Sequence, residues 1–226
     1  MAGCERTGAT SGAGRSLRHH LLQLMKLYDN AFAPSPRRVR MFLAEKGLSV
    51  ERVEIDIASG ANSRAEFLAV NPLGEVPVLE LDDGTRLTES LAVCRYIEAL
   101  HPAPPLLGES PLEQAQIEST VLGLMFRLYV PTTHAFRHTH KFWQGRIPQV
   151  AAYGELARQQ VLAEWQRLDA QLATSTFIAG ERFSFADIVA FTTLEFGKVA
   201  GIRPQPAQTH LLRWREAIAA RPSAAA

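Results

Sequence analysis

Two serines stand where helices are expected to begin, and such positions can bind anions. Ser35 precedes Pro36, and Ser90 follows Glu89. Serine is a preferred N-cap residue, and proline suits the first helical position. A helix start leaves backbone N–H groups unpaired, and these groups favour a negative charge. Val93 stands where a capping box would need Glu or Gln, so we expect the amides after Glu89 to stay free.

Arg37 and Arg38 follow in the first turn of the helix that Ser35 is expected to open. The helix dipole prefers acidic side chains at this end, so two cations there lower the stability of the helix. Either the pair serves an anionic ligand, or it belongs to a solvated face, and the sequence leaves both interpretations open.

Three histidines, His134, His138 and His140, form a cluster in the second half of the chain. Two of them are four residues apart, a spacing that suits metal ligands on a helix. No cysteine or paired acid completes the set, so the sequence predicts no metal. The two cysteines, Cys4 and Cys94, lie far apart, which excludes a disulfide framework and fits a reducing, cytoplasmic compartment.

The bulk composition is that of a globular protein, with 46% apolar and 21% charged residues in a chain of 226. The net charge of +1 predicts neither a nucleic-acid partner nor an anionic membrane surface. Residues 1–24 are rich in Gly, Ser, Thr and Arg. They fit a translated stretch upstream of a start at Met25, a native tail or a weak targeting peptide, and we expect a non-core N-terminal extension.

Apolar periodicity in the first half predicts alternating strands and helices. Asp83-Gly84 is a hairpin signal that joins the last two strands. The expected order is βαβ followed by ββα, with strands over 26–30, 53–57, 78–81 and 85–88 and helices over 35–47, 63–68 and 90–100. Pro77 stands just before the third strand. A trans proline there would only remove a hydrogen bond of the sheet, so a cis peptide bond is the better explanation for a proline at this position.

A proline-rich stretch over 101–110 is predicted to link this half to a second one that is helical throughout. Pro131 is expected to end one of its helices. The segment Ser184-Phe-Ala-Asp187 is expected to cap another, with Phe183 and Ile188 spaced as a hydrophobic staple.

From Met25 onward the chain resembles the glutathione transferase family. Each of four motifs is only moderately specific alone, but their order and spacing are jointly strong. They are Ala33-Pro-Ser-Pro-Arg-Arg-Val-Arg40, Asn71-Pro-Leu-Gly-Glu-Val-Pro77, Glu89-Ser-Leu-Ala-Val-Cys-Arg-Tyr-Ile97 and Phe183-Ser-Phe-Ala-Asp187. The resemblance implies an α/β thioredoxin-like glutathione-binding domain over 25–104 and an all-α C-terminal helical domain over 105–226.

The resemblance also implies how glutathione would bind. In the family, the valine before the cis proline pairs with the cysteinyl backbone of the ligand, a role that falls on Val76 and Pro77. The γ-glutamyl carboxylate lies at the helix start, here Ser90, and its ammonium faces the acid, here Glu89. We also place Arg38 among the glutathione-binding residues. The activity implied is conjugation of glutathione to hydrophobic electrophiles, with peroxide reduction as a further reaction, in a homodimer without metal.

Ser35 is the predicted catalytic residue, because its hydroxyl could donate to the glutathione thiolate at the strand-to-helix turn. The chain departs from the family here. Several classes carry the catalytic Ser or Cys where this chain has Ala33, and beta-like classes carry Cys at the position of Ser35. Activation by Ser35 and activation by backbone amides alone therefore both stay open.

Phe32, Phe126 and Tyr129 are the expected lining of the electrophile pocket, whereas Met125 is expected to pack in the core. Ala33 keeps a second hypothesis open, a non-catalytic glutathione transferase-like binding or interaction module. A thiol-disulfide reductase is a weaker third hypothesis, because no cysteine stands at the strand-to-helix turn.

Overall fold

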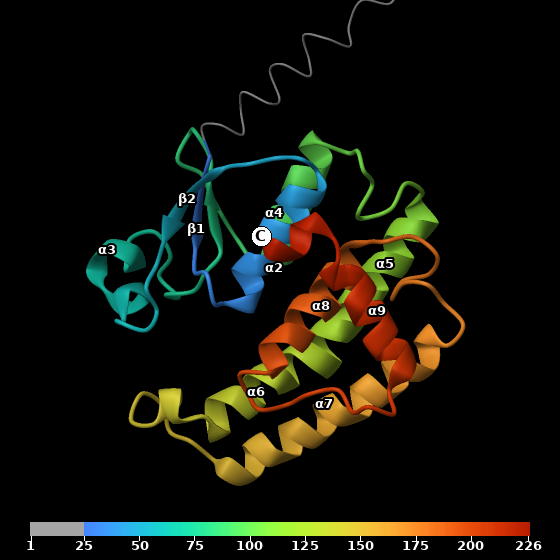
Figure 1. The fold of residues 1–226 in the computed structure, drawn as a ribbon. Helices are drawn as coiled ribbons and strands as arrows, with labels where there is room; N and C mark the ends of the chain where they lie inside the picture. Colours follow the sequence, from blue (N-terminus) through green and yellow to red (C-terminus); the bar gives the residue numbers. More distant parts are fainter. Residues whose placement is uncertain (1–24) are drawn as a thin grey trace, which may run out of the picture.

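A four-stranded sheet organises the first half of the protein (Figure 1). The computed structural model describes residues 25–226, and the predicted extension over 1–24 lies outside the described residues. The elements are β1 (Lys26–Asp29), α2 (Pro34–Glu45), β2 (Glu51–Glu54), α3 (Ala65–Leu68), β3 (Val78–Glu80), β4 (Arg86–Thr88) and α4 (Ser90–Leu100). The strand order is β2-β1-β3-β4, with β1 parallel to β2 and antiparallel to β3. The βαβ-ββα prediction is confirmed.

Strand alternation sends neighbouring side chains to opposite faces of this sheet. Leu27 of β1 and Leu79 of β3 join the main core, to which α2 and α4 contribute. Tyr28 and Val78 instead join a smaller cluster with Phe67 of α3. Helices α2 and α4 therefore cover one face and α3 the other, as Figure 1 shows.

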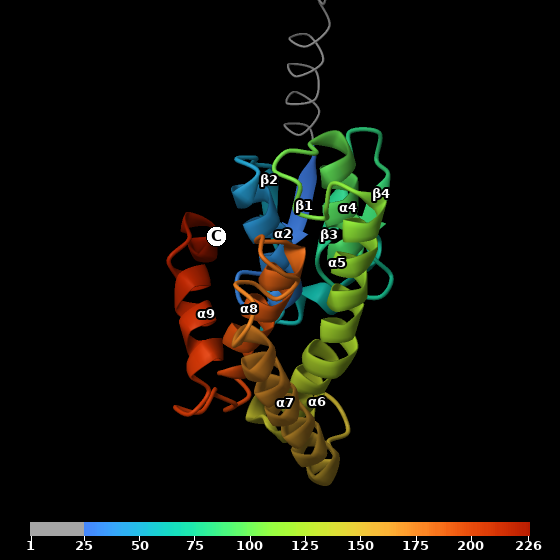
Figure 2. The same ribbon diagram turned by 90° about the vertical axis from the view of Figure 1, so that its right-hand side faces the viewer.

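The second half is helical, as predicted. Its helices are α5 (Pro111–Leu124), α6 (Val130–Thr139), α7 (Ala151–Leu172), α8 (Phe185–Gly197) and α9 (Thr209–Ala219), followed by a short 3-10 turn, Pro222–Ala225. Helix α8 lies at the centre of this half and packs against both α2 and α5 (Figure 2). The predicted cap of α8 is present, because Ser184 and Asp187 form a reciprocal capping box.

Pro131 does not end a helix, contrary to the prediction. A π-helical turn, Met125–Tyr129, joins α5 to α6, and Pro131 occupies the first turn of α6. Proline lacks an N–H group and its ring clashes with the carbonyl four residues earlier. A π turn widens the hydrogen-bond ring at this place, so the chain continues in helical form.

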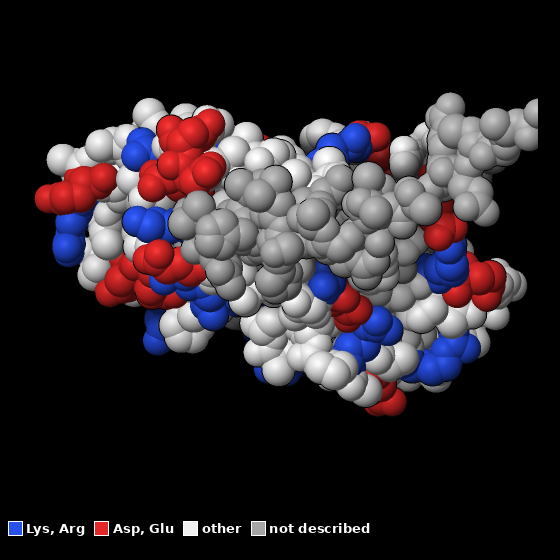
Figure 3. Space-filling view, turned by 90° about the horizontal axis from the view of Figure 1, so that it is seen from above, with Lys and Arg blue, Asp and Glu red and all other residues white. Residues whose placement is uncertain are grey.

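Charged side chains are interspersed on the face shown in Figure 3, where basic and acidic residues of the described chain lie beside one another. In the described part of the chain, ion pairs link Arg52 with Asp29 and Arg86 with Glu80. Among residues 25–226, no helix combines the length and apolar character that a membrane crossing requires.

Candidate functional site

A cleft of about 820 Å³ lies where the sheet half meets the helical half. Residues of both halves line it, so its shape depends on how the two halves pack. Eight of the nine predicted site residues line it: Phe32, Ser35, Arg38, Val76, Pro77, Glu89, Ser90 and Tyr129. The ninth, Phe126, does not.

The start of α2 differs from the prediction that Ser35 caps it. Ala33 is the N-cap and makes no side-chain cap bond, Pro34 is the first helical residue, and Ser35 is the second. The first backbone bond of the helix runs from the Arg37 N–H to the Ala33 carbonyl at 3.4 Å. Because Pro34 and Pro36 have no N–H, the helix start offers one free amide, that of Ser35, beside its hydroxyl.

The Ser35 hydroxyl contacts the other half of the protein. Its Oγ lies 2.7 Å from the Tyr129 hydroxyl, which comes from the π turn between α5 and α6. Either oxygen can donate in this hydrogen bond. The two hydroxyls thus form a pair on the cleft wall at the positive end of α2, where a negative charge is favoured.

The loop before β3 presents Val76 to the cleft. The Val76–Pro77 peptide bond is cis, in agreement with the expectation from the sequence. The ladder between β1 and β3 ends at Val78, so the backbone of Val76 lies beyond it. Asn71 holds the loop by donating from Nδ2 to the Glu75 carbonyl at 2.7 Å. Gly74 has φ +66°, and a Cβ there would lie 2.8 Å from a backbone oxygen, so this position requires glycine.

The start of α4 has free amides, as predicted, although Ser90 is not its N-cap. Glu89 takes that position with φ +66°, a left-handed conformation that is strained for a residue with a side chain. The first backbone bond joins the Val93 N–H to the Glu89 carbonyl at 3.0 Å. The amides of residues 90–92 therefore have no partner within the helix and can bind an anion.

The two adjacent arginines of α2 have different surroundings. Arg37 donates to the Ala224 carbonyl near the C-terminus at 2.8 Å and does not line the cleft. Arg38 lines the cleft, is fully buried, and stacks on Tyr129 with its Cζ 3.9 Å from the ring centroid. Of the two interpretations, a solvated face is therefore wrong for Arg38.

Phe126 points away from the cleft, which corrects its assignment to the electrophile pocket. Its side chain is 71% exposed, whereas Met125 and Tyr129 line the cleft. Met125 and Tyr129 are about one helical turn apart and share a face. Phe126 follows Met125 directly, so its side chain points in another direction. The expectation that Met125 belongs to the core is only partly right, because it packs on the core and also lines the cleft.

Aromatic side chains that were not predicted from the sequence line the helical side of the cleft. Phe136 is their centre, with ring contacts to Phe142, Trp143 and Phe196 at centroid distances of 6.1, 6.0 and 5.2 Å. All four line the cleft. The concentration of aromatic and histidine residues between Phe136 and Trp143 was the available signal for this wall.

The three histidines hold local structure, and His140 also lines the cleft. The His138 and His140 Nδ1 atoms accept from the backbone N–H groups of Val150 and Phe142, and the Nδ1 of His134 lies 2.8 Å from the Tyr153 hydroxyl. Within the described part of the chain, no three His, Cys, Asp or Glu side chains are grouped to hold a metal.

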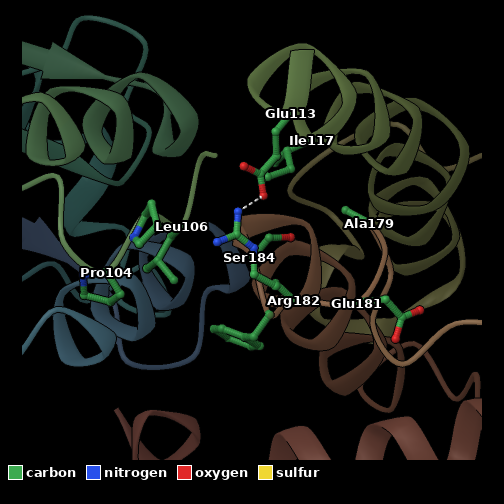
Figure 4. A pocket seen from close by; sticks show the side chains of 10 residues that line it. Pro104, Leu106, Glu113, Ile117, Ala179, Glu181, Arg182 and Ser184 are labelled. Carbon is green, nitrogen blue, oxygen red and sulfur yellow. Dashed lines mark hydrogen bonds and ion pairs between the residues drawn. The ribbon is translucent and has the colours of Figure 1, made fainter. Parts of the chain in front are cut away.

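A second cavity of about 330 Å³ lies between the linker and the starts of α5 and α8 (Figure 4). Its charged groups have partners, because Arg182 pairs with Glu113 and Glu181 accepts a hydrogen bond from Thr176 Oγ1. Cys94 of α4 is buried, which raises the pKa of its thiol well above the ordinary value. Neither feature offers a reactive group, so the larger cleft is the candidate site.

Comparison with known proteins gives the family. The family model described as "Glutathione S-transferase, N-terminal domain" matches residues 32–100, and "Glutathione S-transferase, C-terminal domain" matches residues 123–222. "Glutathione S-transferase 2" of Saccharomyces cerevisiae is 36% identical over 208 residues, which cover 89% of this chain and 88% of that protein. "Glutathione S-transferase 3" of Zea mays is 32% identical over 215 residues, which cover 88% and 90%.

Solved structures agree with the sequence comparisons. A glutathione S-transferase domain-containing protein from Marinobacter aquaeolei has a TM-score of 0.83 at 35% identity, covering 88% of this chain and 98% of that one. Gtt2 from Saccharomyces cerevisiae has a TM-score of 0.83 at 34% identity, covering 88% and 97%. The chain therefore belongs to the glutathione S-transferase family of enzymes.

Proposed function

We propose that the cleft binds reduced glutathione, stabilises its thiolate and directs it to a hydrophobic electrophile. The observation that carries the proposal is that one cleft collects the Val76–Pro77 cis loop, the free amides of α4 and the Ser35–Tyr129 hydroxyl pair. Glutathione offers a matching set of groups: a peptide backbone, a carboxylate and a thiol.

Each part of the ligand has a complementary partner. The backbone of Val76, beyond the end of the sheet ladder, pairs with the cysteinyl residue as an added strand would. The γ-glutamyl carboxylate accepts from the amides at the start of α4. Glu89 is exposed, lines the cleft and makes no ion pair within residues 25–226, so its carboxylate is available to the ligand's ammonium.

The thiolate then lies against Ser35 and Tyr129. The amide and hydroxyl of Ser35 and the hydroxyl of Tyr129 are donors already in place at a helix start. Donors fixed in advance stabilise developing charge without reorganisation during the reaction. Tyr129 thus borders both the thiolate and the electrophile, and no covalent intermediate with the protein is required. Peroxide reduction would use the same thiolate.

The electrophile fits against the aromatic wall around Phe136, with Phe32 at the other side of the cleft. Apolar walls discriminate weakly between hydrophobic ligands, so broad substrate acceptance is expected. We also propose that the protein acts in the cytoplasm as a homodimer. Three exposed apolar residues, Leu112 and Leu122 of α5 and Phe126 of the π turn that follows it, support an interface on this side of the protein.

Two measurements test the proposal. Calorimetry should detect binding of glutathione to the purified protein, and turnover of a panel of aromatic electrophiles and peroxides should be glutathione-dependent. Binding without turnover of any panel member would favour the non-catalytic module. The absence of binding at millimolar glutathione would overturn the proposed function.

A further inference from the structure

Arg38 is a buried cation without a counter-ion. It is fully buried, and its hydrogen bonds within residues 25–226 go only to neutral hydroxyls. Its Nη1 lies 3.4 Å from Ser90 Oγ, and its Nη2 lies 3.4 Å from Thr193 Oγ1 in α8. Its Nε has no hydrogen-bond partner among these described residues. Burial accordingly lowers the pKa of the guanidinium.

A buried cation without a counter-ion lowers the stability of the fold, and most buried arginines have an acidic partner, as the neighbouring Arg40 does. Arg40 is buried on the same helix, but its Nη1 contacts Asp29 Oδ1 at 2.5 Å in an ion pair. A buried charge that lacks a partner destabilises a fold substantially. Arg38 also lies near the start of α2, where the helix dipole is unfavourable to a cation. Stacking on the Tyr129 ring offsets only part of this cost.

The position of Arg38 in the cleft explains why a destabilising buried charge is present. Its guanidinium stacks on Tyr129, whose hydroxyl bonds to Ser35, and it also donates to Ser90 at the start of α4. These contacts place it between the two sites proposed for negative charge, the thiolate at Ser35 and the γ-glutamyl carboxylate at Ser90.

We propose that Arg38 is a positioning residue whose missing counter-ion is anionic glutathione itself. It holds Tyr129 and Ser90 in place for the ligand, and its charge stabilises the bound thiolate across the floor of the cleft. This inference rests on the proposed function and adds the source of the electrostatic stabilisation.

The other groups around Arg38 leave this role to the ligand. Cys94 of α4 is buried and neutral at ordinary pH because its thiol pKa is raised. Thr193 does not ionise. Glu89 is the nearby acid that attracts Arg38 electrostatically, but it is exposed at the cleft rim and makes no ion pair with Arg38.

The test is a pH titration of the thiol of bound glutathione, monitored through the absorbance of the thiolate. Arg38→Gln should raise the midpoint by about one pH unit or more, because a cation within a few ångströms shifts an acid by that amount. Arg38→Lys keeps a positive charge but lacks the planar guanidinium that stacks on Tyr129. Its midpoint should therefore fall between those of the wild-type protein and Arg38→Gln. This variant carries the test if Arg38→Gln does not fold.

The matched control is Arg40→Gln, which removes another buried arginine of α2 outside the cleft. It should lower the melting temperature and leave the thiol midpoint unchanged. A second readout compares ligands. Above the wild-type midpoint, Arg38→Gln should lose about tenfold more affinity for glutathione than for S-methylglutathione, whose sulfur carries no charge.

The outcomes separate this inference from the proposed function. If the wild-type protein fails to lower the thiol pKa of glutathione, the proposed thiolate step fails and this inference fails with it. If the wild-type protein lowers that pKa and both Arg38 variants keep the same midpoint, this inference alone is overturned.

Discussion

The hydroxyl oxygens of Ser35 and Tyr129 lie 2.7 Å apart although 94 positions separate the two residues in sequence. Ser35 belongs to the start of α2 and Tyr129 to the π turn that precedes α6. The hydrogen bond therefore joins the sheet half to the helical half at the candidate site, and it depends on the packing of both.

Removing either hydroxyl should slow conjugation. A hydrogen bond to a charged group contributes about 1.5–3 kcal/mol, so Ser35→Ala and Tyr129→Phe should each lower kcat/KM by about 10- to 100-fold. The double variant should lose less than the product of the two effects, because both hydroxyls act on one thiolate. Tyr153→Phe, outside the cleft, is the control. Full activity in Ser35→Ala would assign activation to the backbone amide instead.

Glu89 should control glutathione affinity more than the chemical step. Its carboxylate is proposed to contact the ligand's ammonium, which does not change during the reaction, so Glu89→Gln should raise KM for glutathione about tenfold with little change in kcat. Asp82→Asn alters another exposed carboxylate, on the β3–β4 hairpin outside the cleft, and should have no effect. A fall in kcat at unchanged KM would contradict this role.

The aromatic wall should determine electrophile binding. Phe136 contacts Phe142, Trp143 and Phe196, so Phe136→Leu should loosen the wall and raise KM for aromatic electrophiles about 3- to 10-fold. The dissociation constant for glutathione, measured by calorimetry, should not change. Phe177→Leu removes a half-buried ring outside the cleft and serves as the control. Equal losses in both variants would point to a general effect on stability.

The exposed apolar residues of α5 and of the π turn that follows it predict an interface. Phe126→Glu places a charge among Leu112 and Leu122, which should convert a dimer to monomers, because an unpaired charge inside an interface is costly. Leu156→Glu makes the same kind of change at an exposed apolar position on α7 and should leave the dimer intact. Sedimentation velocity distinguishes the two masses. A wild-type protein that sediments as a monomer would exclude the proposed homodimer.

The order of elements could be predicted from the sequence because the signals are local. Alternation in the strands, the Asp83-Gly84 turn and the Ser184–Asp187 cap each act within a few residues. The predicted helix starts were less accurate, because Ser35 and Ser90 resemble N-cap residues in the sequence but lie inside their helices. The two prolines that flank Ser35 at α2 and the left-handed Glu89 at α4 changed where these helices begin.

The cleft was only partly predictable, because half of it comes from tertiary packing. Val76 and Glu89 stand in recognisable motifs, whereas the contacts of Arg38 with Tyr129 and Thr193 join segments that are distant in sequence. Phe126 and Tyr129 are equivalent as apolar residues in the sequence. Only the π turn and the docking of α5 decide which of them faces the cleft.

Asp187 should make the stability of the protein depend on pH. It is almost fully buried, and this burial raises its pKa to about 6, although four donors, including the Trp214 Nε1 and the Ile178 N–H, oppose the shift. In the unfolded chain the same carboxyl titrates at its ordinary value of 3.8. Between these two values the folded protein binds more protons than the unfolded chain, so the free energy of unfolding falls as pH rises.

The penalty from the buried charge is therefore complete above pH 6 and is relieved as pH falls toward 4. Its size is about 3 kcal/mol, from a shift of about two pKa units. Asp187→Asn has the same shape and does not titrate. Between pH 7 and pH 4.5, the wild-type protein should thus gain about 2 kcal/mol relative to this variant, and the remainder follows below pH 4. Urea unfolding followed by tryptophan fluorescence at several pH values measures the difference, and parallel pH profiles for the two proteins would show that Asp187 does not titrate in this range.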